Sequence, residues 1–207
     1  MTIAVVDYGM GNLRSVQKAL ERVGAEAVVT REAQTIRSAR GVVLPGVGAF
    51  GACMENLRRF GLDEVVLDVI AHGTPFFGIC LGMQLLFQES EEFGPVRGLG
   101  VLPGRVVRFP TSAERPVPHM GWNQVRVRPD VPHFHNIPNG SFMYFVHSYY
   151  VVPKDPGLVA ATTEYGVEFA SAVYWNNIFA TQYHPEKSQR LGLALLKNFV
   201  ELVARGS

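Results

Sequence analysis

The chain has 207 residues, of which 47% are hydrophobic, and its formal net charge is +1. This length and composition fit one globular domain that buries its own core without cross-links. The near-neutral charge gives no sign of a nucleic-acid-binding surface. No apolar run reaches the roughly 18 residues of a membrane span, and no signal peptide opens the chain. We therefore expect a soluble protein of the reducing cytoplasm, where Cys53 and Cys80 stay unpaired.

The first half of the chain alternates short apolar runs with segments of helical periodicity. Strands are expected at residues 2–7, 25–30, 41–44 and 75–79. Helices are expected from Leu13 to about Val23, and at residues 49–60 and 62–71. Apolar strands without polar alternation, interleaved with helices, are typical of a parallel sheet that is covered on both faces.

After about residue 95 the pattern changes to short segments that alternate or are rich in β-branched residues. These expected strands lie at residues 100–102, 105–109, 123–127, 142–151, 158–163, 170–174 and 178–183. Their close spacing indicates antiparallel pairs. A last helix is expected over residues 190–204, with Ser188 as its cap. Residues 1–204 are thus predicted to form one α/β domain with a mixed, mostly parallel sheet, and residues 205–207 a tail, native or added by cloning.

Cys80 lies in the segment Gly78-Ile79-Cys80-Leu81-Gly82, where an expected strand turns tightly into an expected helix. Such a turn lifts the side chain out of the sheet edge and directs a helix N-terminus at the sulfur, which favours the thiolate. Cys80 is therefore a candidate nucleophile. The alternative is that it packs as a small apolar residue at the end of a strand, as free cysteines commonly do.

A thiolate nucleophile needs a base that can also protonate the leaving group, and that base needs an orienting acceptor. The strand at residues 178–183 should run parallel to its neighbours and bring His184 to the sheet edge where Cys80 emerges. Pro185 restricts His184 to an extended conformation, which lets Glu186 fold back toward the imidazole. Singly, His184 and Glu186 would be read as solvated loop residues, but together with Cys80 they predict a triad.

Acyl transfer also needs donors for the oxyanion. We expect the amide of Leu81 to be free at the helix start, and the glycine-rich segment at residues 44–51 to offer a second donor. That segment also spells the G-x-G-x-x-G of dinucleotide sites, but it follows a later strand than usual and the acidic residue expected about 20 positions on is missing. A purely structural glycine turn is the other alternative.

Histidines at four positions suggest a metal site at first sight: His119, His133, His135 and His147. Their spacing fits no strong zinc template. We therefore expect no metal, and a solvated loop around His133 and His135.

The Cys80 segment and His184-Pro185-Glu186 together resemble the class I, triad-type glutamine amidotransferases. Five motifs, spread over nearly the whole chain, are similar to members that act as separate glutaminase subunits. They are Asp7-Tyr8-Gly9-Met10-Gly11-Asn12, Pro45-Gly46-Val47-Gly48-Ala49-Phe50, Pro118-His119-Met120-Gly121-Trp122-Asn123, Tyr144-Phe145-Val146-His147-Ser148-Tyr149 and His184-Pro185-Glu186-Lys187-Ser188. The resemblance implies a flavodoxin-like α/β fold with additional antiparallel strands in the C-terminal half.

The resemblance further implies hydrolysis of L-glutamine to glutamate and ammonia through a thioester on Cys80, without a cofactor. His184 would act as base and then as acid, and Glu186 would orient it. The oxyanion would be held by the amides of Leu81 and Val47. The implied substrate contacts are Gly48, Gln84, Glu92, Ser148 and Tyr149.

Free ammonia becomes ammonium in water and loses its nucleophilicity, so a biosynthetic glutaminase should deliver it directly to a partner. The resemblance implies a heterodimer with a separate (β/α)8-barrel cyclase, which makes imidazole glycerol phosphate and aminoimidazole carboxamide ribotide (AICAR) in histidine biosynthesis. The matching interface positions are Asn12, Trp122, Tyr144 and Lys187. Without the resemblance they would be read as a helix cap, two core aromatics and a solvated charge.

Two other functions stay open. A glutaminase subunit of a different synthase, such as pyridoxal phosphate synthase, would share the triad, although the motif at residues 118–123 argues against it. A non-catalytic regulatory subunit with the same fold should lack a triad member, and the sequence lacks none.

Overall fold

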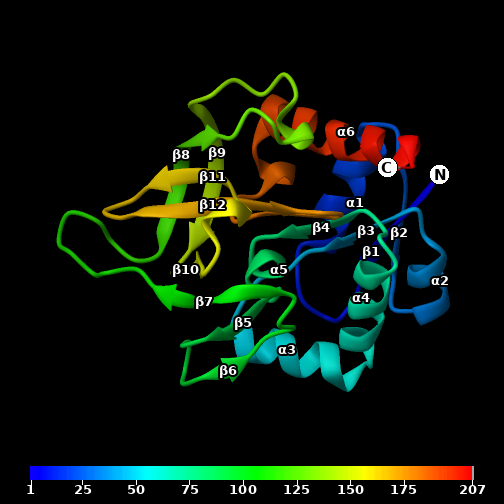
Figure 1. Ribbon diagram of the computed structural model, residues 1–207, viewed down its shortest axis with the longest axis horizontal. Helices are drawn as coiled ribbons and strands as arrows, with labels where there is room; N and C mark the ends of the chain where they lie inside the picture. The colour runs from blue at the N-terminus through cyan, green and yellow to red at the C-terminus, as the bar shows by residue number, and fades with distance from the viewer. Residues whose placement is uncertain (207) are drawn as a thin grey trace.

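The computed structural model describes residues 1–206, and five parallel strands form one end of its sheet (Figure 1). In spatial order they are β2 (Glu26–Thr30), β1 (Thr2–Val6), β3 (Gly41–Leu44), β4 (Phe76–Ile79) and β13 (Ile178–Thr181). In the last pair, Thr181 lies beside Ile79. Both strands therefore end at the same edge, one residue before Cys80 and three before His184.

Helices cover both faces of these parallel strands (Figure 1). Two of them, α1 (Leu13–Arg22) and α6 (Gln189–Arg205), contact each other on one face. The other face carries α2 (Ala33–Ser38), α3 (Phe50–Arg59) and α4 (Leu62–Ala71). The side chains of the strands contribute to two hydrophobic cores, one on each face. On β1, Ile3 and Val5 belong to one core, and Ala4 and Val6 belong to the other. Burial on both faces explains why the strand sequences do not alternate.

The rest of the chain extends the sheet with strands that pair antiparallel, except that β5 and β7 pair in parallel. Beyond β13 follow β12 (Glu168–Trp175), β10 (Tyr149–Pro153), β7 (Leu102–Arg108), β5 (Phe87–Ser90) and β6 (Val96–Arg97). On a branch, β11 (Val159–Glu164) joins β12 to β8 (His119–Val127), which pairs with β9 (Ser141–His147). Short helical segments complete the fold: α5 (Leu81–Gln84), η1 (Pro132–Phe134), η2 (Pro156–Leu158) and η3 (Pro185–Lys187).

The predicted α/β fold with a mixed sheet is confirmed, with several local differences. The sequence did not indicate α2, β5 or β6. The two strands expected at residues 100–109 are one, β7, whereas the single strand expected at residues 142–151 is split into β9 and β10. The split occurs at Ser148, whose carbonyl accepts a bond from the amide of Phe109, as the chain leaves β8 and joins β7.

Three expectations about single residues are wrong. Ser188 precedes α6 but does not cap it, because its hydroxyl donates to the carbonyl of His184 (2.6 Å). His133 is buried rather than solvated, since its ring stacks on Phe179 at 4.0 Å. Arg205 belongs to α6, with Gly206 as its C-cap, whereas Ser207 lies outside the described residues.

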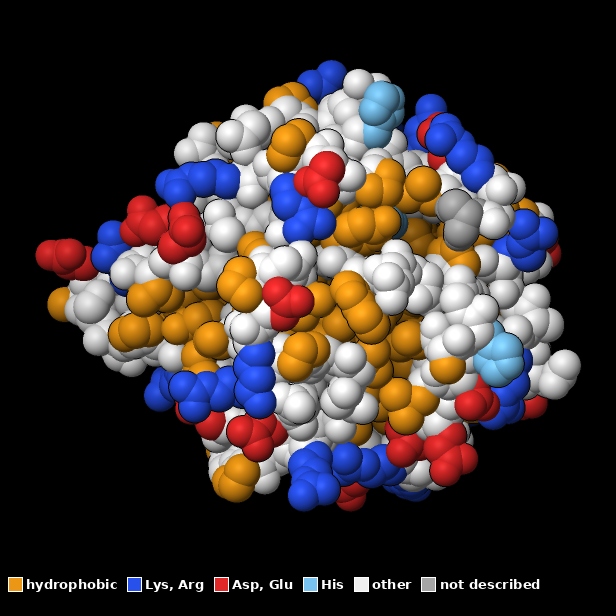
Figure 2. All heavy atoms as spheres, viewed as in Figure 1, with side chains coloured by type: hydrophobic (Ala, Val, Ile, Leu, Met, Phe, Trp, Pro, Cys, Tyr) orange, Lys and Arg blue, Asp and Glu red, His pale blue; other side chains and the backbone are white. Residues whose placement is uncertain are grey.

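The surface carries charges of both signs. On the face drawn in Figure 2, acidic and basic side chains are interspersed around apolar areas, in keeping with the net charge of +1. Within residues 1–206, no helix combines the length and apolar character needed to cross a membrane.

Candidate active site

Cys80 occupies a strained turn between β4 and α5. Its φ of 55° and ψ of −112° are unusual for a residue with a side chain, and such a conformation costs on the order of 1–3 kcal/mol. The turn is held by the amide of Cys80, which donates to the carbonyl of Thr181 at 2.7 Å. It also needs glycine at 82, because a Cβ there would overlap the carbonyl oxygen of Leu44. Since α5 has only four residues, its dipole supports a thiolate less than the sequence suggested.

His184 and Glu186 form a buried pair just beyond β13. Nδ1 of His184 lies 2.8 Å from Oε1 of Glu186, and the two side chains are 2% and 1% exposed. His184 is extended, with φ −99° and ψ 100°, and its amide donates to the carbonyl of Tyr144 at 2.9 Å. Among the described residues, Nε2 of His184 has no conventional hydrogen-bond partner, so this nitrogen is free for a reacting group.

The charges in the site favour a protonated His184. Burial alone disfavours the imidazolium, but the neighbouring Cys80 sulfur and the Glu186 carboxylate together outweigh burial and raise the pKa of His184. An imidazolium beside a sulfur is the arrangement of an activated thiolate nucleophile.

Cys80 and His184 open into a cavity of about 260 Å³. This cavity brings together both expected oxyanion residues and every expected substrate contact: Val47, Gly48, Leu81, Gln84, Glu92, Ser148 and Tyr149. Pro118, Val146 and His147 complete the lining. The cavity is therefore small, partly polar and built around one nucleophile, as a site for a small polar substrate would be.

The oxyanion donors are not arranged as expected. The amide of Leu81 is not free, because it lies 3.4 Å from the carbonyl oxygen of Gly46 in a long hydrogen bond. In a trans peptide the C=O and N–H point in opposite directions, so the amide of Val47 is turned away from that of Leu81. The carbonyls on either side of Gly46 also accept hydrogen bonds. The Pro45 carbonyl accepts from the Tyr8 hydroxyl at 2.6 Å, and the Val47 carbonyl accepts from the Cys53 thiol at 3.5 Å.

A family model described as glutamine amidotransferase class-I matches residues 4–202. The chain belongs to this family. Among curated relatives, it is 55% identical over 205 residues to the imidazole glycerol phosphate synthase subunit HisH of Geobacter sulfurreducens, covering 97% of this chain and 98% of the relative. It is 52% identical over 200 residues to the HisH subunit of Acinetobacter baylyi, with 96% and 97% covered.

Solved structures show the same fold at lower identity. One described as a glutamine amidotransferase superposes with a TM-score of 0.75 at 22% identity, covering 97% of this chain and 98% of that one. The glutaminase domain of Trypanosoma brucei CTPS, solved with bound acivicin, superposes with a TM-score of 0.69 at 17% identity, covering 99% and 94%.

In this class I glutamine amidotransferase, the side chains of Gln84 and Glu92 line the cavity but already have protein partners. Glu92 accepts from the amide of Phe50 at 2.8 Å, at the start of α3. Gln84 Nε2 donates to the carbonyl of Tyr149 and to Oε1 of Gln182, both at 3.0 Å. The sequence reasoning overlooked Gln182, whose Nε2 lies 3.6 Å from the Cys80 sulfur. Its position two residues before His184, at the end of a strand, was the available signal.

Three of the four expected interface residues of this amidotransferase lie together outside the cavity. The rings of Trp122 and Tyr144 meet edge to face at 5.9 Å, and the Lys187 ammonium lies 6.0 Å from the centre of the Tyr144 ring. Trp122 is 46% exposed, so it is not a core aromatic. Asn12 precedes α1, which contacts η3, and its side chain makes no cap hydrogen bond.

Proposed function

We propose that this chain is a glutaminase subunit that hydrolyses L-glutamine to glutamate and ammonia through a Cys80 thioester. The observation that carries the proposal is the buried His184–Glu186 pair, whose His184 lines the same cavity as Cys80. Free cysteines that are only structural do not share a cavity with an imidazolium. The description of the family, glutamine amidotransferase class-I, supports glutamine as the substrate.

The reaction then follows from the charges in place. The Cys80 thiolate attacks the side-chain carbonyl carbon of glutamine, and the C=O electron pair moves to oxygen. As the tetrahedral intermediate collapses, the C–N bond breaks and the His184 imidazolium gives its proton to the departing nitrogen, which leaves as ammonia. The neutral imidazole then takes a proton from water, whose oxygen attacks the thioester. The C–S bond breaks, glutamate leaves, and the thiolate and imidazolium are restored.

The oxyanion of both tetrahedral intermediates needs two donors, and we assign them to the amides of Leu81 and Val47. In the conformation described above, the carbonyl of Gly46 occupies the Leu81 amide, so rotation of the Gly46–Val47 peptide is required. This rotation breaks the 3.4 Å hydrogen bond between the Leu81 amide and the Gly46 carbonyl. We propose that docking of the partner favours the rotated peptide.

The proposed partner is a (β/α)8-barrel cyclase, and the β8–β9 hairpin offers it an apolar face. Met120 is 63% exposed, Phe142 53% and Trp122 46%. Large apolar side chains in such a cluster are typical of a protein interface. The same hairpin carries Val146 of the cavity lining, so ammonia formed at Cys80 would have a short path to the partner. We place the heterodimer in the cytoplasm, where both cysteines remain free thiols, as they are in the structure.

The deciding experiment measures glutamate release with and without the cyclase subunit and its ribulose-phosphate ligand. We expect glutaminase activity to rise when the loaded cyclase is added, to vanish in Cys80→Ala, and to fall by orders of magnitude in His184→Ala. Full activity in Cys80→Ala would refute the mechanism. A pull-down that returned a different synthase would refute the partner, and the absence of labelling of Cys80 by an alkylating glutamine analogue would favour a non-catalytic subunit.

A further inference from the structure

The side chain of Gln182 is fully buried directly behind the nucleophile. It is 0% exposed, and its Nε2 lies 3.6 Å from the Cys80 sulfur. Because a thiolate is a strong acceptor, an N–H group at this distance stabilises it. What this contact does depends on whether the amide nitrogen or the amide oxygen of Gln182 faces the sulfur.

The partners of Gln182 fix that orientation. The carbonyl of Tyr149 can only accept, so the end of Gln84 that bonds to it is the NH₂ group. The same NH₂ group lies 3.0 Å from Gln182, which must therefore present its oxygen there. The NH₂ group of Gln182 is left to face the Cys80 sulfur. The opposite orientation would set two donors against each other and an oxygen against a thiolate.

A second line of hydrogen bonds holds the Tyr149 carbonyl in place. Nδ1 of His147 donates to it at 2.8 Å, and Nε2 of His147 accepts from Nδ1 of His119 at 2.9 Å. The amide of Asn123 then donates to Nε2 of His119 at 3.2 Å. Burial lowers the pKa of His119 to about 4 and that of His147 to about 3, so both rings are neutral and each has one donor and one acceptor nitrogen.

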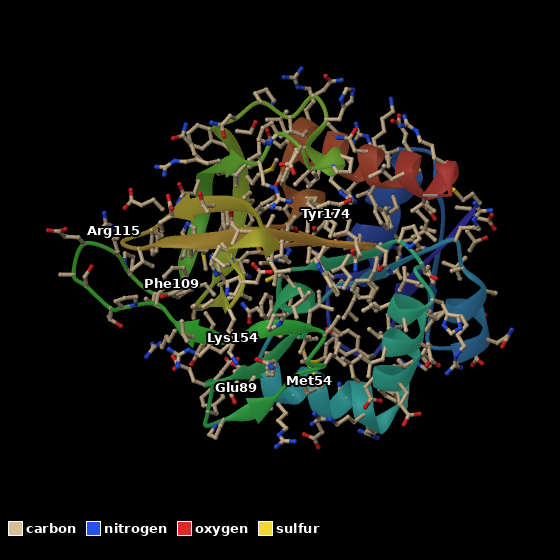
Figure 3. All side chains as sticks on the ribbon, viewed as in Figure 1. Met54, Glu89, Phe109, Arg115, Lys154 and Tyr174 are labelled. Carbon is tan, nitrogen blue, oxygen red and sulfur yellow. The ribbon has the colours of Figure 1, made fainter. Side chains whose placement is uncertain are left out.

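These rings lie within an aromatic cluster, which restricts their movement. Phe109, labelled in Figure 3 beyond the end of β7, contacts His147 at 5.0 Å and His119 at 6.1 Å between ring centres. The hydrogen bonds thus run in one direction from Asn123 to the Tyr149 carbonyl, while Gln84 links that carbonyl to Gln182.

We propose that Gln182 is a catalytic residue whose side-chain NH₂ group donates a hydrogen bond to the Cys80 thiolate. The proposal deepens the glutaminase function and rests on it. Gln182 transfers no proton: it stabilises the negative sulfur before attack and again when the thioester C–S bond breaks and its electron pair returns to sulfur. The four-residue helix α5 is too short to supply this stabilisation by its dipole.

The test compares Gln182→Met, which keeps length but loses the donor, with the wild type. The measurement is the rate of Cys80 alkylation by iodoacetamide as a function of pH, with the modified residue located by mass mapping. The free energy of a hydrogen bond to a charged group corresponds to a shift of the pH midpoint by about one unit or slightly more. We therefore expect the pH midpoint to rise by about one unit, and alkylation below that midpoint to slow about tenfold.

Gln17→Met is the matched control. Gln17 lies on α1 and donates a similar side-chain bond, to the carbonyl of Ala27 at 3.0 Å, away from the cavity. Its midpoint should stay that of the wild type. If Gln182→Met does not fold, Gln84→Met serves instead, because it removes the bond that orients Gln182 and should raise the midpoint by a smaller amount.

An unchanged midpoint in a folded Gln182→Met protein would overturn the proposal, even if glutamine turnover fell, because it would leave Gln182 a structural role only. An equal shift in Gln17→Met would overturn it as well. Iodoacetamide reacts with the thiolate without glutamine. A wild type that alkylates normally but lacks glutaminase activity even with the loaded cyclase would therefore refute the proposed function and leave the role of Gln182 to its own test.

Discussion

Glu186→Gln separates the charge of the third member of the proposed triad from its role in positioning His184. Glutamine is nearly the same size, and its amide oxygen can still accept from Nδ1 of His184, which is 2.8 Å from the carboxylate. A bond to a charged partner contributes roughly 1.5–3 kcal/mol and a neutral one about 1 kcal/mol. Both side chains are almost fully buried, so solvent screens little of the difference. The expected loss of about 0.5–2 kcal/mol corresponds to roughly a 2- to 30-fold lower kcat/KM.

The variant should also change the pH dependence. The carboxylate helps to raise the pKa of His184, so its removal lowers that pKa. The alkaline limb of the kcat/KM profile should then move to lower pH. The assay is glutamate release in the presence of the loaded cyclase, with Glu201→Gln as the control, because Glu201 makes only exposed contacts on α6. A loss below twofold with an unmoved alkaline limb would refute the reasoning, and so would a loss as large as that of His184→Ala.

Three further changes test other parts of the structure. Burial lowers the pKa of His133 to about 3, whereas in an unfolded chain it is about 6.5. Between these two pH values the imidazole is protonated in the unfolded state but not in the folded state. The unfolding free energy therefore falls as the pH drops below about 6.5. When the pH is lowered from 7 to 5, the unfolding free energy measured by urea titration should fall by about 2 kcal/mol less in His133→Phe than in the wild type. An equal fall in the two proteins would contradict this. Tyr8→Phe leaves the Pro45 carbonyl without its 2.6 Å donor and should lower the unfolding free energy by about 1–3 kcal/mol, whereas unchanged stability would mean that another donor replaces it. Gly82→Ala places a Cβ against the Leu44 carbonyl, so the Tm should fall and glutamine turnover should drop about 100-fold or more; wild-type turnover would show that the turn can relax.

The parallel half of the fold was predictable because its signal is local. Each central strand is an apolar run buried on both faces, as in β3, and each helix shows its own periodicity. Once β13 is taken as parallel to β4, the meeting of His184 with Cys80 follows from topology alone. The antiparallel half was harder, because alternation does not reveal where a strand changes partners, as at Ser148 between β9 and β10.

Features that depend on distant contacts could not be predicted from the sequence. His133 is buried by stacking on Phe179, which is 46 positions away in the chain and on the edge strand of the parallel group. The amide of Leu81 is occupied by Gly46, on a loop after a different strand. Gln182 gains its position from Gln84 and Tyr149, which come from α5 and β10. None of these contacts between distant residues changes the local hydrophobic periodicity or motif spacing of the sequence.

The two halves of the site differ in how firmly they are held. Cys80 and His184 follow strands at the centre of the sheet, and short hydrogen bonds of 2.7 to 2.9 Å fix their backbones. The peptide between Gly46 and Val47 lies on a loop, and its own carbonyl is held only by the 3.4 Å bond to Leu81. An oxyanion donor is worth roughly 100- to 1,000-fold in rate. In the glutaminase that we propose, the nucleophile is ready but the Val47 amide is turned away, so we expect little ammonia to form until docking of the partner rotates that peptide.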